Sequence, residues 1–372
     1  MKVIKLLGIL FFLIGCSFDN RSGIWMSENE TSSNKDDLFK EFEKISSNKE
    51  IYNKIIPLTT NYNFKIPKIF YNLDWVDIFY SENNNILNFA YNDSNKTFLK
   101  SKKLTRYNIN NYILAKNNKL ILNDQRGNII LYSLKQNKLI SKFNFYKKKH
   151  KDIQKKLYII IEKNIIYVAD NLGYIYALNI NNNKLLWAKN YKIPFRSNLK
   201  VKKNKIIVSN QKNKLIFLDK KNGNLLNIIP TEETIIHNSF INNLSINDQD
   251  VLFLNSYGSL YSINIINMKI NWFLNLKQST NLNTTDLFLG NQIVNYKDKI
   301  IVSSNDNTYL INALNGSIIE TYNFSSALKP IINDNHILLI TKNNLILAID
   351  LKTNKIIYSY NVIQKVSNFL NS

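Results

Sequence analysis

Cysteine and histidine are almost absent from this sequence. Its 372 residues include one cysteine, Cys16, and three histidines, His150, His237 and His336. A single cysteine excludes an internal disulfide, so the fold must be stable through packing alone. The histidines lie on different repeats with no cysteine to join them, which argues against a transition-metal site. The sequence shows no nucleophile paired with a base, so it gives no support for an acyl-transfer active site.

Hydrophobic runs long enough to cross a membrane are also missing. The apolar run Leu6–Ile14 is interrupted only by Gly8 and follows Lys2 and Lys5. A membrane-spanning helix needs roughly twenty apolar residues, whereas a short apolar run after a positive segment is typical of a secretory signal peptide. We therefore expect residues 1–15 to be a signal peptide.

The four residues Leu13-Ile14-Gly15-Cys16 resemble the lipobox of bacterial lipoproteins. That resemblance implies that Cys16 is acylated and becomes the first residue of the mature protein. A diacyl anchor gives stable attachment to a membrane, which a single chain does not. Ser17 follows the cysteine where lipoproteins of the inner membrane often have Asp, and by resemblance this favours the outer membrane.

The charge balance is strongly positive, with 49 Lys and Arg against 27 Asp and Glu and a net charge of +22. Such a balance raises nucleic acid as a partner. The lysines are spread along the chain among many Asn and Ile residues, as expected for an AT-rich genome, and an exported lipoprotein does not meet the chromosome. We expect no nucleic-acid partner. The dense run from Lys147 to Lys156 is interpreted as a solvated loop, with contact to anionic lipid head groups as the alternative.

Residues 16–60 are polar and predict a flexible tether behind the acylated cysteine. Within it, Leu38, Phe39, Phe42 and Ile45 have helical spacing after two acidic residues, which predicts a short amphipathic helix. The helix either packs on its own domain or docks a partner.

Repeats dominate the rest of the chain, residues 61–372. One copy consists of Asn164–Ala169, Gly173–Asn179 and Asn183–Trp187, three short runs of β-branched and aromatic residues bounded by Asn or Gly. Six copies recur at a period of roughly forty residues, the size of a four-stranded propeller blade. The segment 65–103 predicts one or two degenerate blades. The sequence therefore predicts an all-β protein with one β-propeller of seven or eight four-stranded blades.

Several positions of the repeat are interpreted as structural. Ring closure predicts that residues 61–69 pair with the C-terminal strands around residues 356–360, which removes an exposed edge. The aspartates at repeat positions, Asp170, Asp219 and Asp350, are interpreted as residues that make turns, not as metal ligands. Trp187 and Trp272 also recur and are interpreted as wedges between blades.

The repeat that ends in Trp187 or Trp272 resembles the tryptophan-docking motif of quinoprotein-type propellers. Together with the lipobox, the chain resembles BamB-type lipoproteins of the outer-membrane β-barrel assembly machinery. This resemblance favours eight blades and implies a non-catalytic scaffold that faces the periplasm. It also implies a partner, a BamA-like barrel insertase, whose periplasmic domains bind loops that join successive blades on one face.

Two loops occupy the same positions among the repeats as the binding loops of that family. The first, residues 192–198, contains Phe195 and Arg196, and the second, residues 230–234, contains Glu232 and Glu233. An exposed aromatic beside an arginine is typical of an interface anchor, and adjacent acids steer a basic partner. The alternative for both loops is an ordinary solvated connection.

Two other functions remain open at this point. A quinone-dependent dehydrogenase has the same repeats, but its adjacent disulfide is impossible here, so we expect no enzyme activity, no cofactor, no metal and no small-molecule substrate. A propeller that binds envelope carbohydrate or peptidoglycan is the other alternative. Aromatic residues clustered at one end of the central channel would support it.

Overall fold

The structure is a computed structural model of the chain. It describes residues 16–18, 25–27, 52–59, 62, 64, 67–71, 74–91, 96, 97, 99–146, 150–234, 240–277, 288 and 290–363. The chain divides into two compact units, Met1–Glu50 and Ile51–Ser372. In the first, β1 (Cys16–Phe18) pairs antiparallel with β2 (Trp25–Ser27). The predicted signal peptide and the predicted helix around residues 38–45 lie outside the described residues.

The second unit contains six four-stranded antiparallel sheets, numbered here 1 to 6 in chain order. Sheets 1 to 3 consist of β3 (Leu114–Lys116), β4 (Lys119–Asn123), β5 (Asn128–Ser133) and β6 (Lys138–Asn144); β7 (Leu157–Glu162), β8 (Ile165–Asp170), β9 (Tyr174–Asn179) and β10 (Lys184–Asn190); and β11 (Lys200–Lys202), β12 (Lys205–Ser209), β13 (Leu215–Asp219) and β14 (Leu225–Ile229). Sheets 4 to 6 consist of β15 (Asn243–Asn247), β16 (Asp250–Leu254), β17 (Ser259–Asn264) and β18 (Ile270–Asn275); β19 (Val294–Tyr296), β20 (Lys299–Ser303), β21 (Thr308–Asn312) and β22 (Ile318–Tyr322); and β23 (Ile331–Ile332), β24 (His336–Ile340), β25 (Leu345–Asp350) and β26 (Ile356–Asn361).

Within each sheet the strands pair in sequence order, and burial falls toward the fourth strand. In sheet 2, five of the six residues of β8 are buried, whereas β10 alternates between exposed and partly buried residues. Strands covered on both faces read as continuous apolar runs, whereas a half-covered strand alternates. The fourth strand therefore forms the outer rim.

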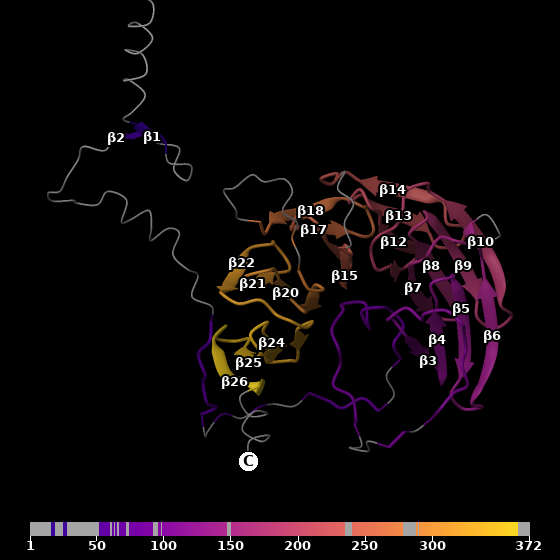
Figure 1. The fold of residues 1–372 in the computed structure, drawn as a ribbon, viewed down its shortest axis with the longest axis horizontal. Helices are drawn as coiled ribbons and strands as arrows, with labels where there is room; N and C mark the ends of the chain where they lie inside the picture. The colour runs from indigo at the N-terminus through magenta and orange to yellow at the C-terminus, as the bar shows by residue number, and fades with distance from the viewer. Residues whose placement is uncertain are drawn as a thin grey trace, which may run out of the picture. The chain divides into compact units, whose positions relative to one another are not determined.

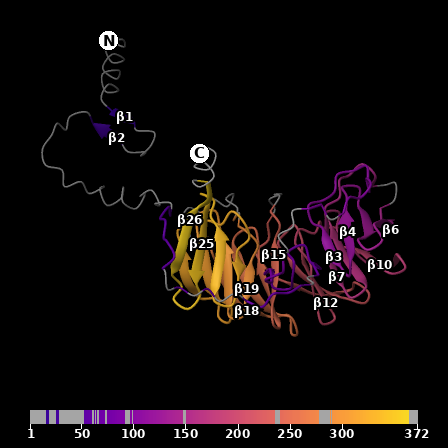
Figure 2. The same ribbon diagram turned by 90° about the horizontal axis from the view of Figure 1, so that it is seen from below.

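The six sheets follow one another around an axis, as Figure 1 shows by the change of colour from magenta through orange to yellow. The first strands β7, β11, β15, β19 and β23 contact one another in that order and form the inner side. Seen from the side, the antiparallel strands of the sheets stand roughly upright beside one another (Figure 2). This arrangement confirms the predicted β-propeller.

The predicted count of seven or eight blades is not confirmed. The described residues form six four-stranded sheets, one for each clear repeat. The segment expected to give one or two more, residues 65–103, forms isolated bridges instead of a sheet among its described residues, such as Phe70 with Phe89. It lies between the first and last sheets (Figure 1).

Ring closure occurs near the predicted place but with an earlier part of the chain. Ile56 pairs with Ser359 of β26 through hydrogen bonds of 3.2 and 2.9 Å in both directions. Of the segment 61–69, predicted to make this pair, the structure describes residues 62, 64 and 67–69, and Tyr62 contributes its side chain. The Tyr62 hydroxyl donates to Asp350 at 2.7 Å and contacts His336 at 2.6 Å.

Residues 75–85 form a central plug on the axis of the propeller, and they hydrogen-bond the inner side of every sheet. Trp75 pairs with Ala115 of β3, and the Val76 carbonyl accepts from Ile161 of β7 at 2.8 Å. The contacts with the other four sheets are Lys200 Nζ to Asn84 Oδ1, Asn84 Nδ2 to the carbonyls of Leu244 and Ile293, Ile246 N to the Glu82 carbonyl, Asn295 N to the Asn83 carbonyl, and Asn85 with the Ile332 backbone.

A buried ion pair fixes the plug to sheet 3. Lys200 Nζ lies 2.6 Å from Asp77 Oδ2, and the two side chains are 0% and 1% exposed. The same ammonium also donates to the Ser81 carbonyl and to Asn84 Oδ1, each at 2.7 Å. Burial raises the pKa of Asp77 and lowers that of Lys200, so each charge depends on the other.

Tryptophans of the fourth strands lie between successive sheets, the position that their interpretation as wedges requires. The Trp187 indole of sheet 2 donates to the Lys220 carbonyl of sheet 3 at 3.2 Å, and Trp272 of sheet 4 donates to Ala313 beside sheet 5 at 3.0 Å. Each ring covers a glycine, Gly223 or Gly316, where a Cβ atom would lie 2.4 or 2.5 Å from the indole.

We predict that Gly223→Ala destabilises the protein in two separable ways. Gly223 has φ of +71°, which costs a side-chain-bearing residue about 1–2 kcal/mol, and displacing the Trp187 ring costs about 1–3 kcal/mol more. Urea unfolding measures the sum. In a Trp187→Ala background only the backbone part should remain. An equal cost of Gly223→Ala in both backgrounds would contradict docking of the ring on the glycine.

We also predict strong coupling between Asp77 and Lys200. Lys200→Met should lower the free energy of unfolding by about 3–5 kcal/mol because it leaves a buried carboxylate without its partner. The double variant with Asp77→Asn should cost less than the sum of the two single changes. The matched control is Lys202→Met in the same strand, whose exposed pair with Glu82 is worth about 1 kcal/mol or less. Additive single costs would contradict the coupling.

Candidate functional site

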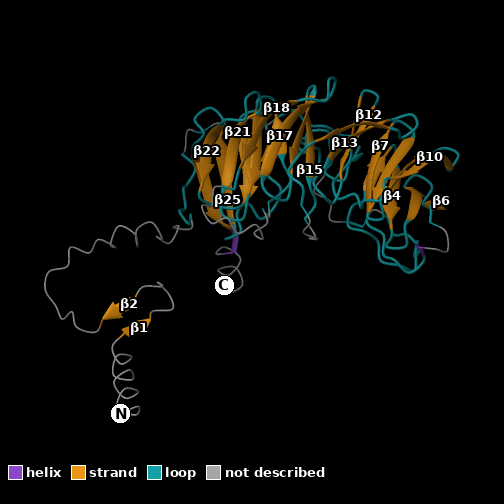
Figure 3. Ribbon diagram, turned by 90° about the horizontal axis from the view of Figure 1, so that it is seen from above, coloured by secondary structure: helices purple, strands orange, loops and turns teal. Residues whose placement is uncertain are grey.

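The loops at one end of the strands form a candidate docking face, called here the connecting face. In a four-stranded antiparallel sheet, the turn from the second to the third strand and the links to both neighbouring sheets lie at the same end. Loops gather at the two ends of the strands (Figure 3). The connecting face therefore carries residues 124–127, 170–173 and 210–213, together with the links between sheets.

Side-chain hydrogen bonds to the backbone hold these turns. Asp170 Oδ1 accepts from the amides of Leu172 and Tyr174, each at 2.8 Å, and Asp124 and Asn210 accept in the same way from the residues two and four positions later. At the opposite end, Asp219 and Asp350 cap their own turns. The prediction that Asp170, Asp219 and Asp350 make turns is confirmed.

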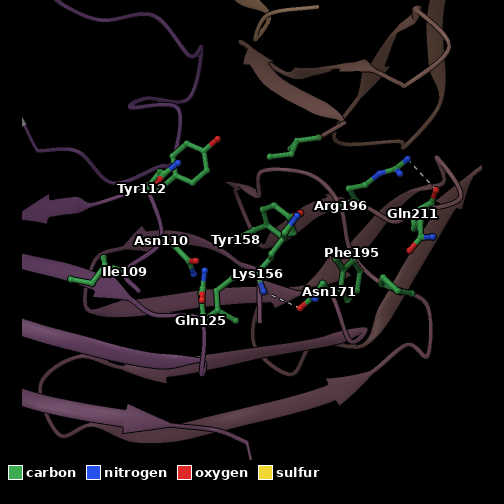
Figure 4. A pocket seen from close by; sticks show the side chains of 14 residues that line it. Ile109, Asn110, Tyr112, Gln125, Lys156, Tyr158, Asn171, Phe195, Arg196 and Gln211 are labelled. Atoms are coloured by element: carbon green, nitrogen blue, oxygen red, sulfur yellow. Dashed lines mark hydrogen bonds between the residues drawn. The ribbon is translucent and has the colours of Figure 1, made fainter. Parts of the chain in front are cut away.

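A pocket of about 530 Å³ opens on the connecting face beside sheets 1 to 3, and Figure 4 shows its lining. Amide side chains make up much of it, and the rest comes from two cations, two tyrosines and apolar residues. The lining residues are Ile109, Asn110, Asn111, Tyr112, Gln125, Lys156, Leu157, Tyr158, Asn171, Pro194, Phe195, Arg196, Gln211 and Ile241. The pocket therefore offers donors and acceptors from three successive sheets.

The predicted anchor residues line this pocket but are buried. Phe195 is 1% exposed and packs edge-to-face on Tyr191 with ring centres 6.0 Å apart. The expectation that it is an exposed aromatic is therefore wrong. Its backbone amide donates to the Asp170 carbonyl at 2.9 Å, which draws the loop inward and places the ring in the core.

Arg196 is also buried, with 7% of its surface exposed. Its Nη2 donates to the Gln211 carbonyl at 3.2 Å, as Figure 4 shows. Burial lowers the pKa of the guanidinium, although an arginine stays protonated at neutral pH. Arg196 therefore adds a positive charge to the wall of the pocket and not to an exposed loop tip.

Glu232 and Glu233 are exposed, as the sequence led us to expect. Glu233 lies 2.6 Å from Lys214 Nζ, and this hydrogen bond lowers the pKa of its carboxyl. Glu232 accepts from the Ser259 hydroxyl of the next sheet. Both acids are outside the pocket lining, so the structure does not bring the two predicted pairs together in one cavity.

The sequence reasoning missed the pocket amides Gln125, Asn171 and Gln211. Each directly follows the turn-capping residue of its repeat, Asp124, Asp170 or Asn210. An amide that recurs beside a turn cap was the signal that could have identified them.

A second cavity, the seam pocket, lies between the plug, the entry to sheet 1 and the start of sheet 6. It measures about 570 Å³ and is mainly apolar. Its lining residues are Trp75, Asp77, Ile78, Phe79, Tyr80, Ile86, Asn111, Tyr112, Ile113, Gln292, Leu328, Lys329 and Ile331. The seam pocket therefore occupies the place where a further blade was expected.

Lys329 is the cation in the wall of the seam pocket. Its ammonium donates to the carbonyls of Phe79 and Asn84 and lies 4.0 Å from the centre of the Tyr80 ring. Burial and the nearby Lys200 lower the pKa of Lys329 from 10.5 to about 7, against the opposing effect of Asp77.

Among the described residues, the His, Asp, Glu and Cys side chains form no group of three or more that could hold a metal ion. No helix in this part of the chain is both long and apolar enough to cross a membrane.

The sheets, their order and their tryptophan docking define a quinoprotein-like β-propeller. A protein-family model described as outer membrane protein assembly factor BamB matches residues 118–360. This match covers more than half of the chain, which therefore belongs to the BamB family.

Solved structures support the same fold. BamB from Moraxella catarrhalis is 12% identical with a TM-score of 0.56, over 67% of this chain and 75% of that one. The computationally designed protein Ika8 is 13% identical with a TM-score of 0.51, over 66% and 71%. At these identities the likeness concerns the fold alone. No curated protein sequence is significantly similar to the chain.

We predict that Lys329 makes stability depend on pH. Between about pH 7 and 10.5 the unfolded chain binds a proton at this residue that the folded protein does not, so this residue makes the free energy of unfolding rise with pH. The slope should reach about 1 kcal/mol per pH unit, somewhat below the limit for a complete difference of one proton. Urea unfolding at pH 7, 8 and 9 measures this. The free energy of unfolding of the wild type should rise with pH relative to that of Lys329→Met. A constant difference between the two proteins would contradict the prediction.

Proposed function

We propose that this protein is a non-catalytic scaffold lipoprotein of the outer-membrane β-barrel assembly machinery. In this proposal its connecting face binds the periplasmic domains of a BamA-like insertase. Acylated Cys16 anchors the protein in the outer membrane, and the propeller faces the periplasm. Family membership supports the role in assembly, and the lipobox supports the anchor.

The observation that carries the proposed binding site is the pocket on the connecting face. Side chains from three successive sheets converge there, with Tyr112, Tyr158 and Arg196 among them. Tyrosine and arginine are enriched in protein interfaces, whereas a lysine-rich solvated surface is not typical of them. The turn caps make the surrounding backbone rigid, which lowers the entropy cost of binding.

The central plug supports a scaffold over a propeller built around a cofactor. Its backbone and side chains use the hydrogen-bonding groups of the inner strands that face the axis. Asp77 is paired with Lys200, and Asp170, Asp219 and Asp350 cap turns. Family membership gives no support to the quinone-dependent or carbohydrate-binding alternatives.

The proposal predicts that filling the pocket weakens binding of the insertase. Gln125→Arg and Gln211→Arg place a larger, charged side chain in the pocket, and each should raise the Kd for the purified periplasmic domains of the native BamA-type insertase at least tenfold. Calorimetric titration of the full chain measures this. Both glutamines are partly exposed, so we expect little effect on folding.

The matched control is Gln136→Arg, an exposed amide in the turn between β5 and β6 at the opposite end of the strands. It should bind like the wild type. If the pocket variants bind as tightly as the wild type, the proposed site is wrong. If the wild type does not bind the insertase at all, the proposed partner is wrong.

A further inference from the structure

The seam pocket combines apolar walls with exposed apolar residues at its border. Leu328 is 60% exposed, Ile113 45% and Trp75 36%. Phe79 and Tyr112 pack edge-to-face in the wall with ring centres 6.1 Å apart. Single exposed apolar side chains are ordinary, but a group of them around a cavity of about 570 Å³ is typical of a binding site.

The basic group beside these apolar walls is Lys329, and its pKa of about 7 leaves it partly protonated at neutral pH. Asp77 is paired with Lys200 at 2.6 Å. Lys329 has no carboxylate within ion-pair distance among the residues that the structure describes; its described acceptors are the carbonyls of Phe79 and Asn84. The Tyr80 ring lies 4.0 Å from the ammonium, and an aromatic face attracts a cation without neutralising its charge.

The amides in the wall are few. Asn111 and Gln292 supply them, whereas Ile78, Ile86, Ile113, Leu328 and Ile331 supply aliphatic surface. A sugar needs many donors and acceptors, and the carboxylate of Asp77 is already taken. The aromatic residues therefore belong to a surface better suited to an apolar chain than to a saccharide.

We propose that the seam pocket binds an apolar chain that ends in a carboxylate, with the chain against the aliphatic wall and the carboxylate paired with Lys329. Two sources share this chemistry, a fatty acid and the C-terminal end of an apolar peptide. Pairing an ammonium with a carboxylate in a partly desolvated pocket is stronger than the same contact in water. The seam pocket shares Asn111 and Tyr112 with the pocket on the connecting face, but this proposal does not rest on the proposed contact with the insertase.

Calorimetric titration of the full chain at pH 6, where Lys329 is mostly protonated, with matched ligands tests the proposal. Dodecanoate should bind at least tenfold more tightly than dodecanol, and an apolar hexapeptide with a free C-terminus should be compared with its C-terminal amide. The pair with the larger ratio of carboxylate to neutral affinity identifies the source. Equal affinities within both pairs, or no binding of any ligand, overturn the proposal.

Two pocket variants and one matched control separate the pocket from general effects on the fold. Leu328→Asp places a negative charge at the border and should weaken dodecanoate binding at least tenfold, whereas Leu314→Asp, at a leucine that is 77% exposed in the turn between β21 and β22, should not. Lys329→Met should abolish the preference for the carboxylate over the alcohol. Unchanged affinity in Leu328→Asp places the ligand elsewhere and overturns the proposal.

An independent readout follows Lys329 itself. Bound dodecanoate should slow the reaction of this lysine with an amine-specific reagent at pH 7.5, as measured by peptide mass spectrometry, while dodecanol should not. Equal labelling of Lys329 with and without dodecanoate excludes the proposed ion pair. Binding of the insertase domains should be the same in Leu328→Asp and the wild type, so failure of this site and failure of the proposed function remain distinguishable.

Discussion

The buried contact between the central plug and the inner strands is the constraint on which the rest of the structure depends. Four of the six inner strands are short, with three residues in β3, β11 and β19 and two in β23, and each inner strand has an edge toward the axis. Unpaired backbone groups at a buried edge cost free energy. The plug removes that cost by hydrogen-bonding every sheet, and the Asp77–Lys200 pair is the point at which it is tied most firmly.

This constraint also bears on the six four-stranded sheets that the described residues form where seven or eight blades were expected. A closed ring of blades covers each sheet with its neighbours, whereas here the described residues between Ile56 and Tyr112 provide part of that cover. It pairs with β26 through Ile56, with β3 through Trp75 and with β23 through Asn85. Two sheets joined by irregular chain pack less completely than two sheets in contact, and the seam pocket lies at this joint.

Each of the six clear repeats corresponds to a four-stranded sheet of the described residues, because the signal of a repeat is local. Each sheet depends on apolar runs and turn residues within about forty positions, as in Asn164–Trp187, so periodicity reveals it. The plug has no such signal. Its partners lie far away in the chain, 123 positions for Asp77 with Lys200 and 247 for Asn85 with Ile332, and a Trp followed by an apolar run reads equally well as a degenerate strand. Phe195 was placed wrongly for a related reason, because a loop aromatic looks exposed until a distant carbonyl is found to hold its backbone.

In the turns of the connecting face, the capping residue and the residue that follows it have different structural roles. The caps Asp124, Asp170 and Asn210 fix the backbone from within each turn, through bonds to amides two and four residues later. The side chains that follow them, Gln125, Asn171 and Gln211, line the pocket, and none supplies the bonds that cap its turn. A change at Gln125 or Gln211 therefore alters the surface of the pocket at little cost to folding, whereas a change at the caps alters the fold. Asn171 differs from these two glutamines, because its side chain accepts a hydrogen bond from the Lys156 amide and donates one to the Gln154 carbonyl. This amide therefore also holds the link between sheets 1 and 2.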